Sequence, residues 1–189
     1  MKKLAVVLLA IVCCVVLADS VYAVALQKGE TVYVRSNLHV DGNTIFWHNM
    51  SIFRRIIPVG TPVKIEKSVG GRIVFNTPDS NKTYRVVADS KQWDKFFVKN
   101  KSEIGLDTVS PGKKGEIDKG KVSIGMTKQE VYASRGCPAY LAWGKTTEQS
   151  SFDSIMKSDK WYYMTNSRGH DLMVTFQNGN VVKIGGFEK

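Results

Sequence analysis

The residue types suited to nucleophilic chemistry are few in this sequence. Two of its three cysteines, Cys13 and Cys14, lie in an apolar run near the N-terminus, and Cys137 follows a segment that we expect to be helical. The C-terminus of a helix carries a partial negative charge, which raises the pKa of a nearby thiol and makes it a poorer nucleophile. We therefore interpret Cys137 as a small core residue, with an intermolecular disulfide as the alternative if the side chain is exposed.

Metal and base chemistry could use only three histidines, which are His39, His48 and His170. None has a cysteine or carboxylate at the spacing of a metal site, and the chain contains neither a G-x-S-x-G elbow nor an H-E-x-x-H motif. Gly115 to Lys121 has the G-x4-G-K spacing of a phosphate-binding loop, but Val122 stands where that loop needs a hydroxyl side chain. We predict no catalytic residue, metal, cofactor or nucleotide, and we expect that the chain is not an enzyme.

Residues 1–25 have the layout of a secretory signal peptide. A basic start, Met1-Lys2-Lys3, is followed by the apolar run Leu4 to Ala18, and Ala23 and Ala25 supply the small residues that cleavage requires. The run is shorter than the roughly 20 residues of a membrane-spanning helix. Ile11-Val12 before Cys13 lacks the small residues of a lipoprotein signal. We expect this segment to be removed on export, which leaves Cys137 as the single thiol.

The charge balance indicates an anionic partner. The 189 residues include 27 Lys and Arg against 17 Asp and Glu, a formal net charge of +10, and the 43% apolar content is that of a globular protein. Because export separates the chain from nucleic acid, we expect anionic lipid or a cell-wall polymer, in addition to a protein partner in the envelope. The candidate contacts are Arg54, Arg55, Lys113, Lys114, Lys119 and Lys121.

The exported chain is expected to divide into two units joined by a linker. Residues 108–121 contain three glycines, one proline and four lysines, a composition typical of a linker. The first unit, 26–107, contains alternating or β-branched segments that predict strands over 31–35, 44–47, 62–67, 72–75 and 83–87. Ser90 is expected to begin a helix that packs Trp93, Phe96 and Phe97 against one end of a small barrel. This pattern predicts an SH3-like β domain.

The second unit, 122–189, has sharper local signals. Thr127-Lys-Gln-Glu130 predicts a capping box, with Met126 and Val131 as a hydrophobic staple, and Gly136 before Pro138 predicts the end of that helix. A second short helix is expected around 152–156, followed by strands over 160–164, 171–176 and 180–184. Asn178-Gly179 predicts a hairpin between the last two strands.

These motifs resemble those of the SmpA/OmlA (BamE-like) family. The residues that carry the resemblance are Ile124-Gly125-Met126-Thr127, Val131, Gly136-Cys137-Pro138, Trp161-Tyr162-Tyr163 and Val174 to Val181, in about the C-terminal third of the chain. The resemblance implies two helices on a three-stranded antiparallel sheet over 122–189. It also implies a bacterial chain in the periplasm, free or associated with the outer membrane, that works without catalysis through protein and lipid contacts. The predicted fold is α+β, with an SH3-like barrel and a BamE-like domain.

We therefore predict a non-catalytic adaptor or scaffold of the cell envelope, serving outer-membrane or envelope assembly. The alternative is a ligand-binding module whose first unit holds peptidoglycan, a peptide or anionic lipid. In that alternative Trp47, Tyr84 and Trp93 would contact the ligand and Arg54 and Arg55 would lie at the rim. The strand and helix spacing of these three aromatic residues favours core positions instead.

Overall fold

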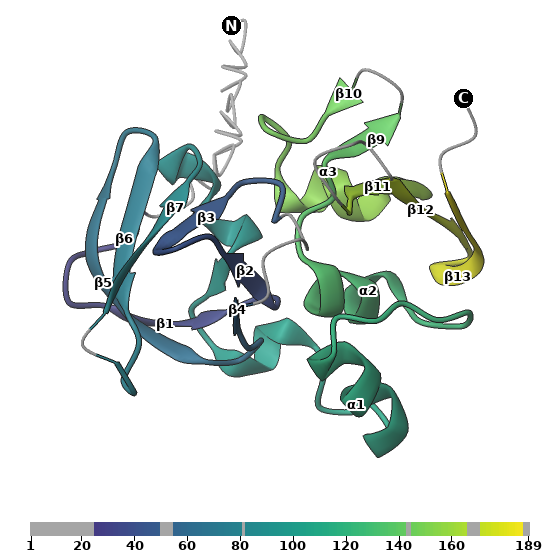
Figure 1. Ribbon diagram of the computed structural model, residues 1–189, viewed down its shortest axis with the longest axis horizontal. Coiled ribbons are helices and arrows are strands. Elements are labelled where there is room, and N and C mark those ends of the chain that lie inside the picture. The colour runs from purple at the N-terminus through teal and green to yellow at the C-terminus, as the bar shows by residue number, and fades with distance from the viewer. Residues whose placement is uncertain (1–24, 50–54, 81, 143–144, 166–170, 187–189) are drawn as a thin grey trace, which may run out of the picture.

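The computed structural model describes residues 25–49, 55–80, 82–142, 145–165 and 171–186. Residues 1–24 of the predicted signal peptide, Arg54 and His170 lie outside the described residues. The chain has a mixed α+β fold, mostly strands with a few short helices, built around two hydrophobic cores (Figure 1). One core contains side chains from residues 26–97 and the other contains side chains from residues 117–181.

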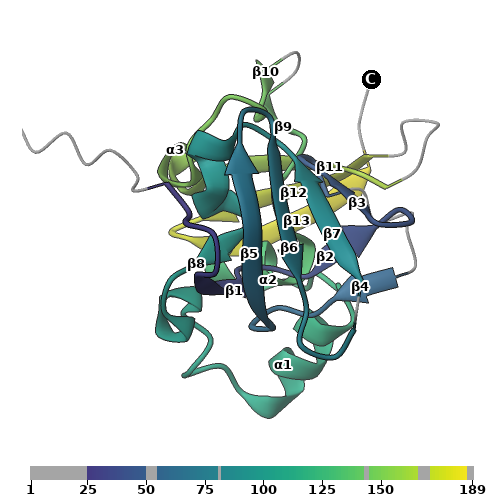
Figure 2. The same cartoon turned by 90° about the vertical axis from the view of Figure 1, so that its left-hand side faces the viewer.

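A curled sheet surrounds the first core. Its strand order is β3-β7-β6-β5-β1-β8, and β2 and β4 form a separate antiparallel pair. The strands are β1 (Thr31–Val34), β2 (Leu38–Val40), β3 (Thr44–Phe46), β4 (Arg55–Ile57), β5 (Pro62–Val69), β6 (Arg72–Asn76), β7 (Thr83–Val87) and β8 (Phe97–Val98). β5, β6 and β7 lie side by side, and the sheet curves into a half-barrel (Figure 2).

The alternation in the sequence explains which strand faces are buried. On β5, Val63 and Ile65 are buried in the first core whereas Lys64 between them is exposed. The five predicted strands of the first unit are confirmed within a few residues, and Gly70-Gly71 joins β5 to β6. The strands β2, β4 and β8 were not predicted, because each is only two or three residues long.

The predicted helix at Ser90 is wrong in type and length. Residues Ser90–Lys95 form a 3-10 helix, η1, that Asp89 caps by accepting a 2.9 Å hydrogen bond from the amide of Lys91. Phe97 belongs to β8 because it pairs with Val34 of β1, and this pairing ends the helical path. The expected burial of Trp93, Phe96 and Phe97 in the first core is nevertheless confirmed. A second 3-10 helix, η2, spans Lys101–Ile104.

The second core lies between short helices and a five-stranded antiparallel sheet. The sheet order is β10-β9-β11-β12-β13. The elements are α1 (Pro111–Asp118), α2 (Lys128–Arg135), β9 (Tyr140–Ala142), β10 (Lys145–Thr146), α3 (Phe152–Lys157), β11 (Lys160–Met164), β12 (Asp171–Gln177) and β13 (Asn180–Gly186). The three strands and two helices predicted for 122–189 are confirmed, and β9 and β10 widen the sheet beyond the prediction.

The predicted turn and cap chemistry is confirmed in detail. The Thr127 hydroxyl accepts a 3.1 Å hydrogen bond from the Glu130 amide, and the Glu130 carboxylate accepts one of 2.7 Å from the Thr127 amide. Asn178 and Gly179 have φ values of 51° and 79°, which the two-residue turn between antiparallel strands requires. These contacts are local in sequence, which is why sequence reasoning could specify them.

Residues 108–121, whose composition predicts a linker, contain a helix. Pro111–Asp118 fold into α1, with Ser110 at its N-cap and Pro111 in its first turn. Ile117, the one apolar residue near the end of this helix, is fully buried in the second core. A single well-placed apolar side chain therefore attaches a segment of otherwise polar composition.

Candidate functional site

The basic residues predicted to contact anions divide between two elements. Arg55 begins β4, where Nη2 donates a 2.5 Å hydrogen bond to the Tyr84 hydroxyl and the guanidinium lies 5.2 Å from the Tyr84 ring centroid. Lys113 and Lys114 lie on α1, and Lys119 and Lys121 follow its end and are exposed. Arg55 of the first unit and the four lysines of residues 108–121 therefore lie on separate elements.

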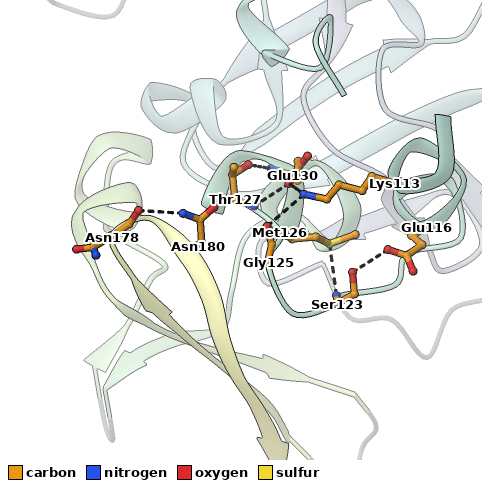
Figure 3. Close-up of polar contacts among 9 residues, drawn as sticks. All are labelled: Lys113, Glu116, Ser123, Gly125, Met126, Thr127, Glu130, Asn178 and Asn180. Atoms are coloured by element: carbon orange, nitrogen blue, oxygen red, sulfur yellow. Dashed lines mark hydrogen bonds and ion pairs between the residues drawn. The ribbon is translucent and has the colours of Figure 1, made fainter. Parts of the chain in front are cut away.

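Lys113 has a role within the fold (Figure 3). Its Nζ donates a 3.1 Å hydrogen bond to the Gly125 carbonyl and lies 3.3 Å from Glu130 Oε2, the same oxygen that accepts from the Thr127 amide. A parallel contact joins Ser123 Oγ to Glu116 Oε2 at 2.7 Å. Lys113 therefore ties α1 to the start of α2, and its charge is already paired with Glu130.

The Gly-Met-Thr motif that begins α2 also extends the sheet. The Gly125 amide donates to the Val181 carbonyl at 2.9 Å, and the Val181 amide donates to the Met126 carbonyl at 2.7 Å. Thr127 forms an antiparallel bridge with Asn180, beside the Asn178-Gly179 turn. These contacts give the motif a structural role.

A cavity of about 340 Å³ opens between the first unit, η2 and α1. It is lined by Val59, Gly60, Lys101, Ile104, Leu106, Asp107, Val109, Lys114 and Asp118. Four of these side chains are apolar, two are lysines and two are aspartates. A cavity with this lining suits a ligand that has an apolar part and carries charges of both signs. Of the predicted site residues, only Lys114 takes part.

One buried asparagine connects the walls of this cavity through hydrogen bonds. Asn37 is fully buried, and its side-chain oxygen accepts a 3.0 Å hydrogen bond from the amide of Val59, a wall residue. Its Nδ2 donates to the carbonyls of Ile117 on α1 at 2.6 Å and of Ser134 on α2 at 3.2 Å. The first unit and α1 are therefore fixed relative to each other at the point where the cavity lies between them.

Asn49 and Lys95 make further contacts of this kind, and we call the contacts of Asn37, Asn49 and Lys95 with the second unit the seam. Asn49 Nδ2 donates 2.7 Å hydrogen bonds to the carbonyls of Asn37 and Arg135. Lys95 is completely buried, and its Nζ donates to the carbonyls of Thr147 at 3.0 Å and Glu148 at 2.9 Å. Buried polar groups paired in this way connect the two units by hydrogen bonds.

Cys137 lies beside the seam and is 1% exposed, so its predicted role as a core residue is confirmed. Its Sγ is 3.4 Å from Thr147 Oγ1 and 3.4 Å from the Pro138 carbonyl oxygen. Burial is the main cause that raises the pKa of the thiol, while the nearby Lys95 ammonium opposes the shift. Burial also lowers the pKa of Lys95. Cys137 is therefore held as a thiol inside the fold.

The aromatic residues considered for ligand binding by the first unit are core residues. Tyr84 is 3% and Trp93 is 8% exposed, which confirms the core interpretation of both, and Trp47 packs partly buried against the same core. His39 is buried on β2. His48 is half-buried, with its ring 5.9 Å from that of Phe46, and burial lowers its pKa. The first unit therefore does not present Tyr84 or Trp93 to a ligand.

Within the described residues, His, Cys, Asp and Glu side chains form no group of three that could hold a metal ion. None of the helices in the same part of the chain is long and apolar enough to cross a membrane.

Sequence reasoning did not identify Asn37, Asn49 or Lys95. Asn37 belongs to no motif, Asn49 begins only an N-x-S triplet that does not indicate these contacts, and the partners of both are up to 97 residues away in the chain. The only local sign was a lysine close to the aromatic residues Trp93, Phe96 and Phe97.

Comparison of the chain with protein-family models, with curated proteins and with solved structures finds no match to any of the three.

Proposed function

We propose that this chain is a non-catalytic adaptor of the bacterial cell envelope that holds a segment of a protein partner in the cavity between η2 and α1. The observation that carries the proposal is the lining of that cavity, which combines four apolar side chains with two lysines and two aspartates. An extended or helical peptide offers the same combination of apolar anchors and charges of both signs.

The hydrogen bonds that connect the cavity walls support this proposal. These walls come from the first unit and from residues 108–121, and Asn37 connects the two by bonding to Val59 and to Ile117. A cavity that is already formed loses little conformational entropy when a ligand binds. An adaptor needs a surface of this kind, because its function depends on the partner that it positions.

The proposed family relationship concerns the second unit. The order of its elements, two helices α2 and α3 before the antiparallel strands β11, β12 and β13, supports a BamE-like domain. The additional strands β9 and β10 are a departure from the expected three-stranded sheet. The curled sheet of the first unit supports an SH3-like barrel as the second component of the proposed architecture.

The proposed location is the periplasm, free or associated with the outer membrane, and the predicted signal peptide supports it. The exposed Lys119 and Lys121 at the end of α1 are the predicted basic residues best placed to meet anionic lipid or wall polymer there. Lys113 is not assigned this role, because its ammonium group forms an ion pair with Glu130.

The proposal is tested by photo-crosslinking of the full chain in cells. A photoreactive amino acid at Leu106, in the cavity, should give a defined protein adduct, whereas the same amino acid at Val69 on β5 should not. The adduct at Leu106 should be lost when Lys114→Glu and Asp118→Lys exchange the charges at the wall. Equal adducts at the two positions, or an adduct at Leu106 that survives the charge exchange, would contradict the proposal.

A further inference from the structure

The outer face of the second sheet carries a row of two tyrosines and a methionine. The antiparallel register places Tyr162 on β11 opposite Tyr140 on β9 and also opposite Met173 on β12. Residues paired in this way point to the same face of a sheet. The alternate residues Trp161 and Tyr163 are buried in the second core, so the row faces away from that core.

A row of lysines runs beside the tyrosines on the same face. Lys160 on β11 is opposite Thr175 on β12, which is opposite Lys183 on β13, and both lysines are exposed. Since adjacent strands lie about 4.8 Å apart, the backbones that carry the two lysines are roughly 10 Å apart. Lys145 on β10 pairs with Ala142 and extends the positive charge toward the other edge of the sheet.

The tyrosine row ends at a glycine on the edge strand. Gly185 on β13 is opposite Met173, and a Cβ at this position would lie 3.8 Å from Met173 Cε, an ordinary contact. A larger residue would thus be accepted here, and its side chain would pack beside Met173. β9, β11, β12 and β13 lie on the side of the second unit away from the first unit, so the first unit does not cover this face (Figure 1).

We infer that this face binds a strand of an acidic polysaccharide. Sugar rings have apolar C–H faces that stack on aromatic rings, and β-sheet faces are used in this way by oligosaccharide-binding proteins. Tyr140 and Tyr162 provide the stacking surface. Lys160 on β11 and Lys183 on β13 flank Thr175 on β12, and they pair with anionic groups carried along the polymer.

The charge of the face and the predicted export together favour this ligand. Single-stranded nucleic acid also uses aromatic stacking beside a positive track, but the signal peptide separates the chain from nucleic acid. The inference goes beyond the proposed adaptor role and uses none of the cavity residues. It would give the adaptor an attachment to the polysaccharide of the envelope.

Binding is measured by fluorescence anisotropy with the full exported chain, from residue 26 onward. The probe is a labelled hexasaccharide of alternating glucuronate and N-acetylglucosamine at low salt. The double variant Lys160→Glu, Lys183→Glu should weaken binding about tenfold or more. The matched control, Lys64→Glu with Lys67→Glu on β5, changes the net charge equally on exposed residues of the first sheet and should change binding less than about twofold.

Stacking and access are tested on the same probe. Tyr162→Leu keeps an apolar side chain but removes the ring, and it should weaken binding about fivefold, whereas Tyr33→Leu on β1 should not. Gly185→Val should weaken binding by covering Met173. Thermal unfolding is recorded for every variant, and Lys160→Gln with Lys183→Gln replaces the charge reversal if that variant does not fold.

Several results would overturn the inference. These are the absence of saturable binding, an equal loss in the Lys64 and Lys67 control, or equal affinity for an uncharged N-acetylglucosamine hexamer. Tighter binding to oligo-thymidine or to phosphatidylglycerol vesicles would reassign the face to nucleic acid or lipid. Lys114→Glu with Asp118→Lys should leave the affinity for the hexasaccharide unchanged, which separates this test from that of the adaptor proposal.

Discussion

Gly136 and Asn49 are in direct contact across the seam. A Cβ atom at Gly136 would collide with Nδ2 of Asn49 and would lie 3.0 Å from Ser36 Oγ, and the backbone of Gly136 has φ +75° and ψ −155°, a conformation essentially limited to glycine. Asn49 cannot move away, since its Nδ2 donates to two carbonyls and its Oδ1 accepts from the His39 amide at 2.7 Å. The glycine that ends α2 therefore also allows the two units to approach each other.

Gly136→Ala is expected to lower the free energy of unfolding by about 3 kcal/mol or more, because backbone strain and a clash with a fixed side chain act together. Urea denaturation followed by circular dichroism measures this. Gly115→Ala is the control: it lies in α1 with nothing within 4 Å of the added Cβ, and it should be neutral or stabilise the protein by up to about 1 kcal/mol. Similar effects of the two substitutions would refute the contact.

Asn37→Ala should destabilise the protein by about 2–4 kcal/mol. The substitution removes three side-chain hydrogen bonds and leaves the buried carbonyl of Ile117 without this donor. Asn43→Ala, at an exposed turn, should change stability by less than about 0.5 kcal/mol. Hydrogen exchange of the Val59 amide should accelerate in the Asn37 variant, and an unchanged rate would show that Asn37 does not hold the cavity wall.

Lys113→Met should destabilise the protein by about 1 kcal/mol, because it breaks the half-buried ion pair with Glu130. A double-mutant cycle with Glu130→Gln should give a coupling energy of about 0.5–1.5 kcal/mol. The neighbouring Lys114→Met, on an exposed residue of the same helix, should stay within about 0.5 kcal/mol of the wild type. A coupling energy near zero would return Lys113 to the set of lysines available for anions.

The Cys137 thiol should be unreactive in the folded protein. Burial raises its pKa and excludes the reagent, so labelling with a chromogenic disulfide at pH 8 should be slower than in urea by several orders of magnitude. The labelling rate of the native protein should follow its unfolding equilibrium as urea is added. Rapid labelling of fully folded protein would mean that this residue is accessible.

Stability should fall as the pH is lowered from 7.5 to 5.5, in part through His48. Burial lowers the pKa of His48 below 6.5, so the unfolded state binds a proton more readily than the folded state in this range. The contribution is present above pH 6.5 and is lost as the pH falls toward the folded pKa. Urea midpoints at the two pH values measure the slope, and His48→Gln should reduce it. An unchanged slope in that variant would assign the dependence to other groups.

Much of the local structure could be predicted from the sequence, because the residues that determine it are close together in the chain. The capping box of Thr127 and Glu130 and the Asn178-Gly179 turn depend on contacts over a few residues. The short strands β2 and β8 were not predictable in this way. Phe97 is in a strand because Val34, more than sixty residues earlier, pairs with it.

The sequence alone determined the longer strands, the capping box of Thr127 and Glu130 and the Asn178-Gly179 hairpin, because these follow from local residue patterns, and it determined the strong net positive charge. The tertiary structure decided the surroundings of each charge. Lys113 is paired with Glu130, Lys95 is buried against two carbonyls, and Lys160 and Lys183 lie on the same face of the second sheet as Tyr162. The amino-acid composition does not distinguish these lysines from one another. Burial, hydrogen bonding and strand register in the folded chain give each lysine a different environment.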